Sequence, residues 1–377
     1  MGVGEYLFTR RYIPGTALRG ALAEALIKKS RMDPKSDAFR QLFEGPRALR
    51  FEPAYPAIDT DRGYPFPLTA RRCKAIRHRH CAFDTLVSQV VFEEQVAASK
   101  QDGIPLPFIE RPRCPHCWEK VEPATSCYVW DDVNKRPHTL PKPELVRHTH
   151  TAINRARGVA EDGMLYTLET LEPGTWLHGC LWVEEGQADQ VRIALGNVTR
   201  LGRGIHRGRG QVRITLQGEV EDVKTQTRIE RLTDLFQAER AFFTKLTGRE
   251  LPPDRGHYFT LDLLSPAVFG NGVAATLEPD PLDLGEGVEL IRRFVAPETV
   301  GGWWKAAGLP HPTALAAATG SVFLYRAPPE TDLSWLSGRL DKLRATGVGR
   351  LRERGYGAVM PCAPFHLWTA EKEAERQ

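Results

Sequence analysis

Residues 195–210 read LGNVTRLGRGIHRGRG, a glycine-rich stretch in which arginine recurs. From residue 200 to residue 213 there are five arginines and no acidic residue. Glycine lets a backbone amide approach a phosphate oxygen closely and tolerates positive φ, and the arginine fork matches phosphate with two parallel hydrogen bonds. The stretch therefore predicts a surface that holds a nucleic-acid backbone without reading its sequence.

A second stretch of the same character, GVGRLRERGYG, occupies residues 347–357. Apolar periodicity predicts a helix before each loop, at 188–195 and at 333–345. It predicts a strand after each loop, at 211–216 and at 358–361. A dinucleotide-binding loop has the reverse order, because its G-x-G-x-x-G follows a strand and opens a helix. One such loop is equally compatible with a solvated turn, but two at equivalent places favour phosphate binding and indicate a weak internal repeat.

The length and composition are those of a globular protein of about two domains. The chain has 377 residues, of which 41% are hydrophobic and 26% are charged. Its net charge is only +4, so the placement of the arginines says more about partners than their total does. No stretch reaches the ~20 apolar residues of a membrane span, and the N-terminus does not resemble a signal peptide. We therefore expect a cytoplasmic protein without membrane contact.

Strands interleaved with helices in each half predict an α+β fold. We expect an N-terminal domain over residues 1–223, a linker helix over 224–255 and a C-terminal domain over 256–377. Residues 44–145 are rich in Pro, His, Arg and Cys and predict an irregular insertion in the first domain. The other predicted elements are helices over 17–29, with Thr16 as N-cap, and 37–43, and strands over 165–169, 175–183, 258–264 and 320–325.

Four of the seven cysteines group as metal ligands do. Cys114 and Cys117 form a C-x-x-C knuckle, and Cys73 and Cys81 lie upstream with a looser spacing. Four thiolates hold zinc tetrahedrally, and an insertion with little core gains stability from such a clip. We expect a structural zinc site with these four ligands. One alternative is a histidine in place of one cysteine, and another is a set of reduced thiols without metal. The candidate histidines are His78, His80 and His116. The three remaining cysteines, Cys127, Cys180 and Cys362, are interpreted as isolated small apolar residues.

The segment YIPGTALRGAL at residues 12–22 resembles the IPG-[S/T]-x-x-[R/K]-G segment of the RAMP superfamily of CRISPR-associated proteins. The two glycine loops resemble the glycine-rich signature of that superfamily. The arrangement is similar to the two-domain, handle-binding large subunit of type III effector complexes, and most similar to the subtype III-D version. Further similar segments are residues 148–155 and 163–166, and the subtype III-D resemblance rests on residues 51–56, 65–70 and 73–74.

The resemblance implies two ferredoxin-like (RRM-like) domains, the first with the zinc-binding insertion. It also implies a role in antiviral defence, contact with the 5′ repeat-derived handle of the guide RNA, and a large signalling subunit and backbone RAMP subunits as partners, with target RNA contacted indirectly. RAMP domains open with a strand ahead of the IPG segment, and the residues before Tyr12 make a poor strand. The expected RNA contacts are Arg19, His148, His150, Arg200, Gly202, Arg203, Gly204, His206, Arg207, Gly208, Arg209, Gly210, Gly347, Gly349, Arg350, Arg352, Arg354, Gly355 and Gly357.

The sequence favours binding over catalysis. No H-E-x-x-H, G-x-S-x-G or G-G-D-D motif is present, and the first aspartate, Asp33, follows the IPG segment, whereas the catalytic aspartate of target-cleaving relatives precedes it. His148 and His150 would share one face of a strand and could serve acid–base cleavage of RNA. Contact with RNA or solvent is the favoured interpretation of this pair.

Two other functions stay open besides a non-catalytic RNA-binding scaffold. One is a metal-independent RAMP endoribonuclease that processes repeat RNA with His148 or His150. The other is a zinc-dependent assembly module whose loops face protein partners. Tyr12, Tyr356, Trp303 and Trp304 are candidates for stacking on bases, although core packing is the favoured interpretation of the two tryptophans.

Overall fold

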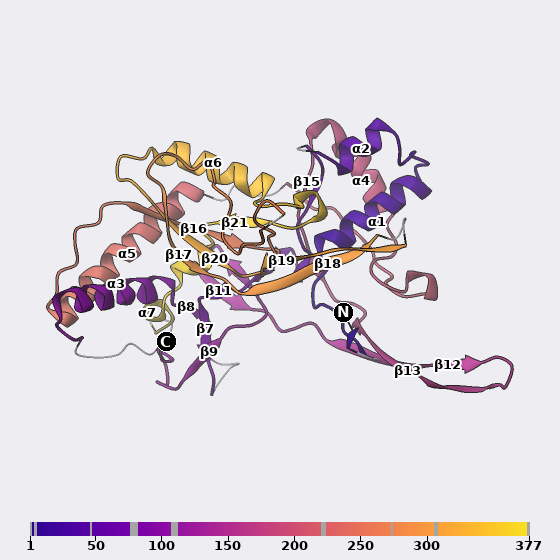
Figure 1. Cartoon of the computed structure of the whole chain (residues 1–377), viewed down its shortest axis with the longest axis horizontal. Coiled ribbons are helices and arrows are strands. Elements are labelled where there is room, and N and C mark those ends of the chain that lie inside the picture. Colours follow the sequence, from indigo (N-terminus) through magenta and orange to yellow (C-terminus); the bar gives the residue numbers. More distant parts are fainter. Residues whose placement is uncertain are drawn as a thin grey trace.

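The computed structural model describes residues 2–3, 6–45, 47–75, 82–106, 112–219, 224–272, 274–304 and 308–374. Figure 1 shows a mixed α/β molecule with helices gathered at two ends and a long hairpin that projects from one side. One end holds α3 (Leu86–Asp102), α5 (Thr225–Thr247) and α6 (Leu333–Thr346), and the other holds α1 (Gly15–Lys28), α2 (Asp37–Phe43) and α4 (Ala188–Gly196).

The C-terminal half is built on a four-stranded antiparallel sheet in the order β17-β20-β16-β21. Strand side chains alternate between its two faces. Phe259 and Phe323 join Leu336 of α6 in one core cluster. Tyr258 and Leu324 join side chains of α3 and α5 in another. Both faces are therefore buried, and the strands are β16 (His257–Leu263), β17 (Glu289–Phe294), β20 (Val322–Ala327) and β21 (Val359–Pro361).

The N-terminal half has a helical core and a separate sheet. Leu22 and Leu26 of α1 pack with residues of α2 and α4 in one buried cluster. The Ser36 hydroxyl caps α2 by accepting from the Phe39 amide at 3.2 Å. The expected Thr16 cap of α1 is wrong, because Pro14 precedes the first turn and Thr16 lies inside the helix.

The sheet of the N-terminal half has the order β1-β2-β13-β12. Strand β2 pairs in parallel with β13, so a two-residue strand does stand ahead of the IPG segment. Strands β12 and β13 continue past this pairing as the projecting hairpin of Figure 1. The strands are β1 (Gly2–Val3), β2 (Tyr6–Leu7), β12 (Leu145–Asn154) and β13 (Val159–Leu171).

Residues 44–145 are more ordered than the composition predicts. They contain α3, a helix of 17 residues whose Leu86, Val90 and Val91 pack against α5. Burial against a partner distant in sequence stabilises this helix, and no local signal announces such a partner. The expectation of an irregular insertion is therefore wrong for this helix. The remaining elements here are short strands: β3 (Arg50–Phe51), β4 (Tyr55–Ile58), β5 (Asp61–Arg62), β6 (Tyr64–Pro65), β7 (Ala70–Cys73), β8 (Phe83–Asp84), β9 (Val121–Pro123), β10 (Cys127–Asp131) and β11 (Arg136–Thr139).

Two predicted strands differ from the structure. The stretch 175–183 is divided into β14 (Leu177–His178) and β15 (Leu181–Trp182), which belong to different sheets. Residues 211–216 are not a strand: only Gln211 makes a single bridge, to Arg200. The alternating Val212 and Ile214 pack against α1 instead of extending a sheet. The other predicted helices and strands are present, although β13 begins six residues before the predicted strand and α5 ends eight residues before the predicted linker helix.

A buried imidazole joins the insertion to the C-terminal sheet. His366 donates from Nδ1 to Asp84 and from Nε2 to Asp262, both at 2.7 Å. All three side chains are almost fully buried. Burial alone would lower the pKa of His366, but the carboxylates of Asp262 and Asp84 raise it to about 10. The imidazole is therefore charged at neutral pH and ties these segments together.

Among the described residues, none of the helices combines the length and the apolar character that crossing a bilayer requires.

Candidate nucleic-acid interface

The first glycine loop, residues 196–210, is closed on itself by a backbone hydrogen bond from Leu201 N to Gly210 O at 2.7 Å. Gly202, Gly204, Gly208 and Gly210 all have positive φ, between 69° and 90°. A Cβ on Gly210 would lie 1.9 Å from the Leu201 carbonyl oxygen, so glycine is required there. Between Gly204 and Gly208 the chain forms the 3₁₀ turn η2 (Ile205–Arg207).

The second glycine loop, residues 347–357, repeats this backbone position for position. Val348 N donates to Gly357 O at 2.9 Å, and a Cβ on Gly357 would again lie 1.9 Å from the facing carbonyl oxygen. A 3₁₀ turn, η3 (Arg352–Arg354), stands where η2 stands in the first loop. Leu351 adopts positive φ where the first loop has Gly204. The internal repeat indicated by the sequence pattern is thus present in the backbone.

The two loops differ in what surrounds them. In the first loop, Arg200, Arg203, His206 and Arg207 are exposed. In the second, Gly347, Gly355 and Gly357 are buried, and only Arg350 and Arg352 among the arginines are exposed. The arginines of the first loop are therefore the more accessible to a ligand.

The second loop is buried against the IPG segment. A Cβ on Gly355 would lie 2.8 Å from the backbone of Gly15, and a Cβ on Gly15 would lie 2.1 Å from the Phe51 carbonyl oxygen. Two glycines from opposite halves of the chain therefore let their backbones touch. At the other end of α1, Ala25 packs against Val198 and Leu201 of the first loop, so one helix contacts both loops.

Arg19 lies beside the second loop. Its Nη2 donates to the Phe43 carbonyl at 3.2 Å, and burial lowers its pKa despite the nearby Glu353 carboxylate. Arg50, which the sequence analysis missed, is 9% exposed and donates to the Ala345 carbonyl at the entry to this loop. Burial lowers the pKa of Arg50 to about 10. Cationic groups thus accumulate around the second loop on its buried side.

The base of the β12–β13 hairpin meets the first loop. Arg207 donates to the Tyr166 hydroxyl at 2.9 Å, and Arg209 contacts His150 Nε2. The rings of His150 and Tyr166 are stacked at 5.3 Å, and that of His148 follows at 6.3 Å. Burial and the Arg209 charge lower the pKa of His150. Two histidines, a tyrosine and two arginines therefore form one surface, which has planar rings and phosphate-matching cations.

Tyr166 was missed in the sequence analysis, although its position opposite His150 in the hairpin register could have identified it. Trp303 is 64% exposed, so the expectation that it packs in the core is wrong. Tyr12 is half-buried, with its ring centroid 5.1 Å from that of Tyr55, and the Tyr356 hydroxyl donates to the Gly301 carbonyl. The side chain of Trp304 lies outside the described residues.

Three of the four predicted zinc ligands come together. Atoms of Cys73, Cys114 and Cys117 lie within 4.8 Å of one another, and the sulfurs of Cys73 and Cys117 are 3.5 Å apart. Three clustered thiols could supply three of the four ligands that a structural zinc ion takes. Cys81, His78 and His80 lie outside the described residues. His116 Nε2 contacts Glu373 at 3.0 Å, in α7 (Ala370–Ala374), and among the described residues the ring nitrogens of His116 are not part of the cysteine cluster.

The other described cysteines behave as apolar residues. Cys127, Cys180 and Cys362 stand apart from the cluster. Burial raises the pKa of each thiol to about 12. They stay protonated at neutral pH, in agreement with their interpretation as isolated small side chains.

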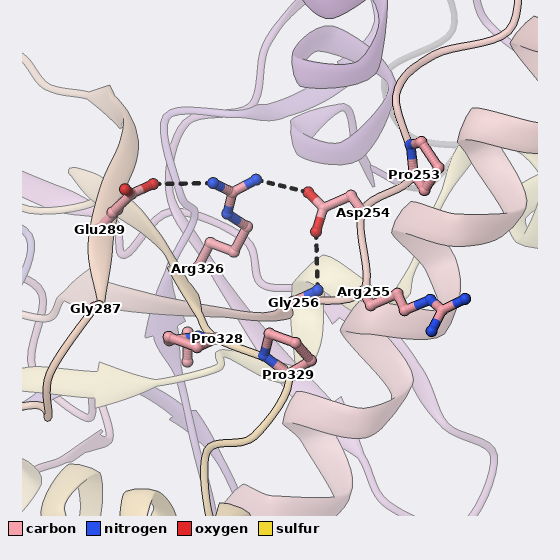
Figure 2. A pocket seen from close by; sticks show the side chains of 10 residues that line it. Pro253, Asp254, Arg255, Gly256, Gly287, Glu289, Arg326, Pro328 and Pro329 are labelled. Atoms are coloured by element: carbon pink, nitrogen blue, oxygen red, sulfur yellow. Dashed lines mark hydrogen bonds and ion pairs between the residues drawn. The ribbon is translucent and has the colours of Figure 1, made fainter.

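A cavity of about 560 Å³ lies at the end of β16 and β20, between the prolines Pro253, Pro328 and Pro329 (Figure 2). Arg326 extends across it and pairs with Asp254 and Glu289, both at 2.9 Å. The hydrogen bond that Arg326 donates to Asp254 raises the pKa of Arg326. Because this arginine is paired on both sides, the cavity offers little to a phosphate, and we assign no site there.

Two family models match the chain. The model of the RAMP superfamily matches residues 1–213, more than half of the sequence. The chain belongs to the RAMP superfamily. A second model, described as CRISPR-associated protein (Cas_Cmr3), matches residues 127–361 of this RAMP protein and places it in that family as well. The family predicted from the IPG segment and the glycine loops is thereby confirmed.

Several solved structures resemble this RAMP protein at low sequence identity. A chain of "Cryo-EM structure of the Type III-B Cmr-beta bound to cognate target RNA" is 10% identical, with 96% of this chain and 89% of that chain covered and a TM-score of 0.40. A chain of "Crystal structure of Csm3-Csm4 subcomplex in the type III-A CRISPR-Cas interference complex" is 12% identical, with coverage of 84% and 88% and a TM-score of 0.36. No curated protein matches the sequence. The classification therefore rests on the two family models.

Proposed function

We propose that this RAMP protein is a non-catalytic RNA-binding scaffold subunit of a type III CRISPR effector complex. It binds the 5′ repeat-derived handle of the guide RNA, and it contacts the large signalling subunit and a backbone RAMP subunit. Membership in a CRISPR-associated family supports the proposal that the protein works in a CRISPR effector complex. The closest subtype is III-D, as the resemblance of residues 51–56 and 65–70 implies.

The observation that carries the RNA-binding role is the surface shared by the first loop and the β12–β13 hairpin. Exposed Arg207 contacts Tyr166 and half-buried Arg209 contacts His150, and the rings of Tyr166 and His150 are stacked. Arg203 is exposed in the same loop. Cations that match phosphates next to rings that stack on bases are the two components of single-strand binding. The second loop holds the two halves together and offers Arg350 and Arg352 at its rim.

Replacing Arg203, Arg207 and Arg209 by alanine tests this role. A labelled handle RNA should bind more weakly, and the slope of log affinity against log salt should fall by about 2, because three phosphate contacts are lost. The triple variant Lys28→Ala/Lys29→Ala/Lys35→Ala removes equal charge from exposed positions and is the matched control. Unchanged handle binding in the loop variant would remove the support for this interface.

We also propose that the C-terminal half is a ferredoxin-like domain. Taken in chain order, its strands lie in the spatial order second-third-first-fourth, and α6 connects the third to the fourth. The described residues between the first and second strands, within 264–288, contain no helix, so the helix that follows the first strand of that fold is absent there. The boundaries 1–223, 224–255 and 256–377 remain our division of the chain, and limited proteolysis tests them.

The cysteine cluster is proposed to hold structural zinc. Cys73, Cys114 and Cys117 would supply three ligands and Cys81 the fourth. Elemental analysis of the purified protein should find one zinc per chain, and Cys114→Ser should abolish it. Cys362→Ser, which removes a buried thiol outside the cluster, should leave the metal content unchanged.

The alternative function, a metal-independent endoribonuclease, would use the histidine pair of the hairpin. His148 and His150 do share one face, and the lowered pKa of His150 suits a general base. Incubation of labelled repeat RNA without metal decides between the two. We expect no cleavage; a discrete cut that disappears in His148→Ala would establish the enzyme instead.

A further inference from the structure

The cysteine knuckle presents an exposed tryptophan. Trp118 follows Cys117 directly and is 76% exposed, whereas the cysteines beside it are buried or half-buried. Burial of a tryptophan is strongly favourable, so an exposed ring at this position leaves apolar surface in contact with water. The knuckle therefore carries an aromatic ring that contributes little to the core.

The backbone of Trp118 is also held in an unfavourable conformation. Its φ is 58°, in the left-handed region that bulky residues avoid. A hydrogen bond from its amide to the Cys114 carbonyl at 2.9 Å keeps it there. Such strain concentrates at functional positions. A glycine would satisfy this turn more easily, so the tryptophan is present at a cost to stability.

A row of cations runs across the same small sheet. Lys120 stands opposite Arg113 on one side, and the Lys74 amide donates to its carbonyl at 3.0 Å on the other. Residues directly opposite in antiparallel strands project to the same face, so the three cations are cross-strand neighbours. All three are exposed, and the nearest acid in the turn, Glu119, is exposed as well. Like charges in this arrangement repel, and a polyanion relieves the repulsion.

We propose that this knuckle surface, Trp118 with Arg113, Lys120 and Lys74, binds single-stranded nucleic acid. The indole face stacks on a base and the cations contact the flanking phosphates, without sequence selection. The site is separate from the glycine loops: Lys74 follows β7 and Lys120 precedes β9, and these strands lie apart from α1 and α4 in Figure 1. The inference does not depend on handle binding by the first loop.

The test uses the full chain carrying Arg203→Ala, Arg207→Ala and Arg209→Ala, so that binding through the first loop is reduced. Fluorescently labelled U12 and dT12 are titrated at low salt, and anisotropy is followed. We expect Trp118→Ala to weaken the binding of both probes by about 5- to 150-fold, the loss of one stacked base. Trp118→Phe should retain most of the affinity, because it keeps an aromatic face.

Two controls make the result specific. Trp176→Ala removes a tryptophan of similar exposure, 71%, at another place and should change nothing. Lys74→Glu/Lys120→Glu leaves the tryptophan intact and should weaken binding and reduce its salt dependence. This variant tests the proposal independently if Trp118→Ala disturbs the knuckle. Zinc content and urea unfolding show whether Trp118→Ala disturbs the knuckle.

The proposal is overturned if the loop variant binds neither probe, or if Trp118→Ala and Lys74→Glu/Lys120→Glu bind as tightly as Trp176→Ala. In either case the exposed ring would serve contact with a protein. Failure of the handle-binding proposal looks different, because it is measured on handle RNA with the glycine-loop arginines as the only change.

Discussion

Removal of the buried imidazole at position 366 should be among the most damaging single changes in this protein. His366→Gln leaves the carboxylates of Asp84 and Asp262 buried without the cation between them. The rise in the pKa of His366 from 6.5 to about 10 corresponds to a preference of about 5 kcal/mol for the charged form. Loss of one partner of a buried ion pair costs about 3–5 kcal/mol, so both arguments give a similar magnitude.

The sign of the pH dependence follows from the direction of the shift. Because the pKa of His366 is raised in the folded state, its contribution to stability is complete below pH 6.5. This contribution declines as the pH rises from 6.5 to about 10, where the folded protein also loses the proton. The wild-type protein should therefore lose stability over this range, and the variant should lose much less.

Urea unfolding at pH 6 and at pH 9.5 measures both effects. We expect His366→Gln to lower the free energy of unfolding by several kcal/mol at pH 6 and by clearly less at pH 9.5. His138→Gln is the matched control: His138 also pairs with an aspartate, Asp131, but it is 43% exposed and should cost less than about 1 kcal/mol. A loss below 1 kcal/mol for His366→Gln, or the same loss at both pH values, would refute the reasoning.

Three further changes probe the packing of the chain, each measured by urea unfolding or thermal melting. Gly355→Ala should lower the free energy of unfolding by about 2–4 kcal/mol, because the new Cβ would lie 2.8 Å from backbone and the φ of this residue is 88°. Gly20→Ala in α1 is the control: its Cβ meets nothing within 4 Å, so the change should be neutral or stabilising. Equal effects of the two changes would contradict the contact between the halves. Glu52→Gln should cost about 3–5 kcal/mol, because Arg62, 2.6 Å away and buried, loses its counter-charge, and a wild-type melting temperature in that variant would refute this. Glu373→Gln should lower the melting temperature, because it weakens the hydrogen bonds of Glu373 with His116 and Trp368. It should also make the protein more sensitive to a zinc chelator. Unchanged sensitivity to the chelator would show that the knuckle and the C-terminal helix are independent.

Local signals predicted most of the regular elements, since helix periodicity, turn residues and alternation act within one segment. The helix at 37–43 is present with the predicted bounds, and α4 and α6 end at the glycine loops as expected. The errors fall where a distant partner decides. Helix α3 is stabilised by α5, and the segment after the first loop packs on α1 instead of pairing as a strand. Neither partner is visible in the local sequence.

The residues of the candidate site fall into the same two groups, those that the local sequence identifies and those that it does not. The glycines and arginines of both loops, the cysteine cluster and the His148–His150 pair were identified from residue type and spacing. Arg50, Tyr166 and Trp118 were missed, because each acquires its role from neighbours in space: the carbonyl of Ala345, the ring of His150, and the knuckle that leaves an indole exposed.

The sequence by itself indicated two glycine loops at equivalent places, because glycines recur at the same spacing in both, at 202, 208 and 210 and at 349, 355 and 357, and glycine adopts positive φ at little cost. It also determined the superfamily, through the IPG segment and those loops together. Only the tertiary structure decided that the loops differ in exposure. The second is buried where Gly355 meets Gly15, and the first stays exposed beside the hairpin, because α1 contacts one loop through backbone and the other through a single apolar face.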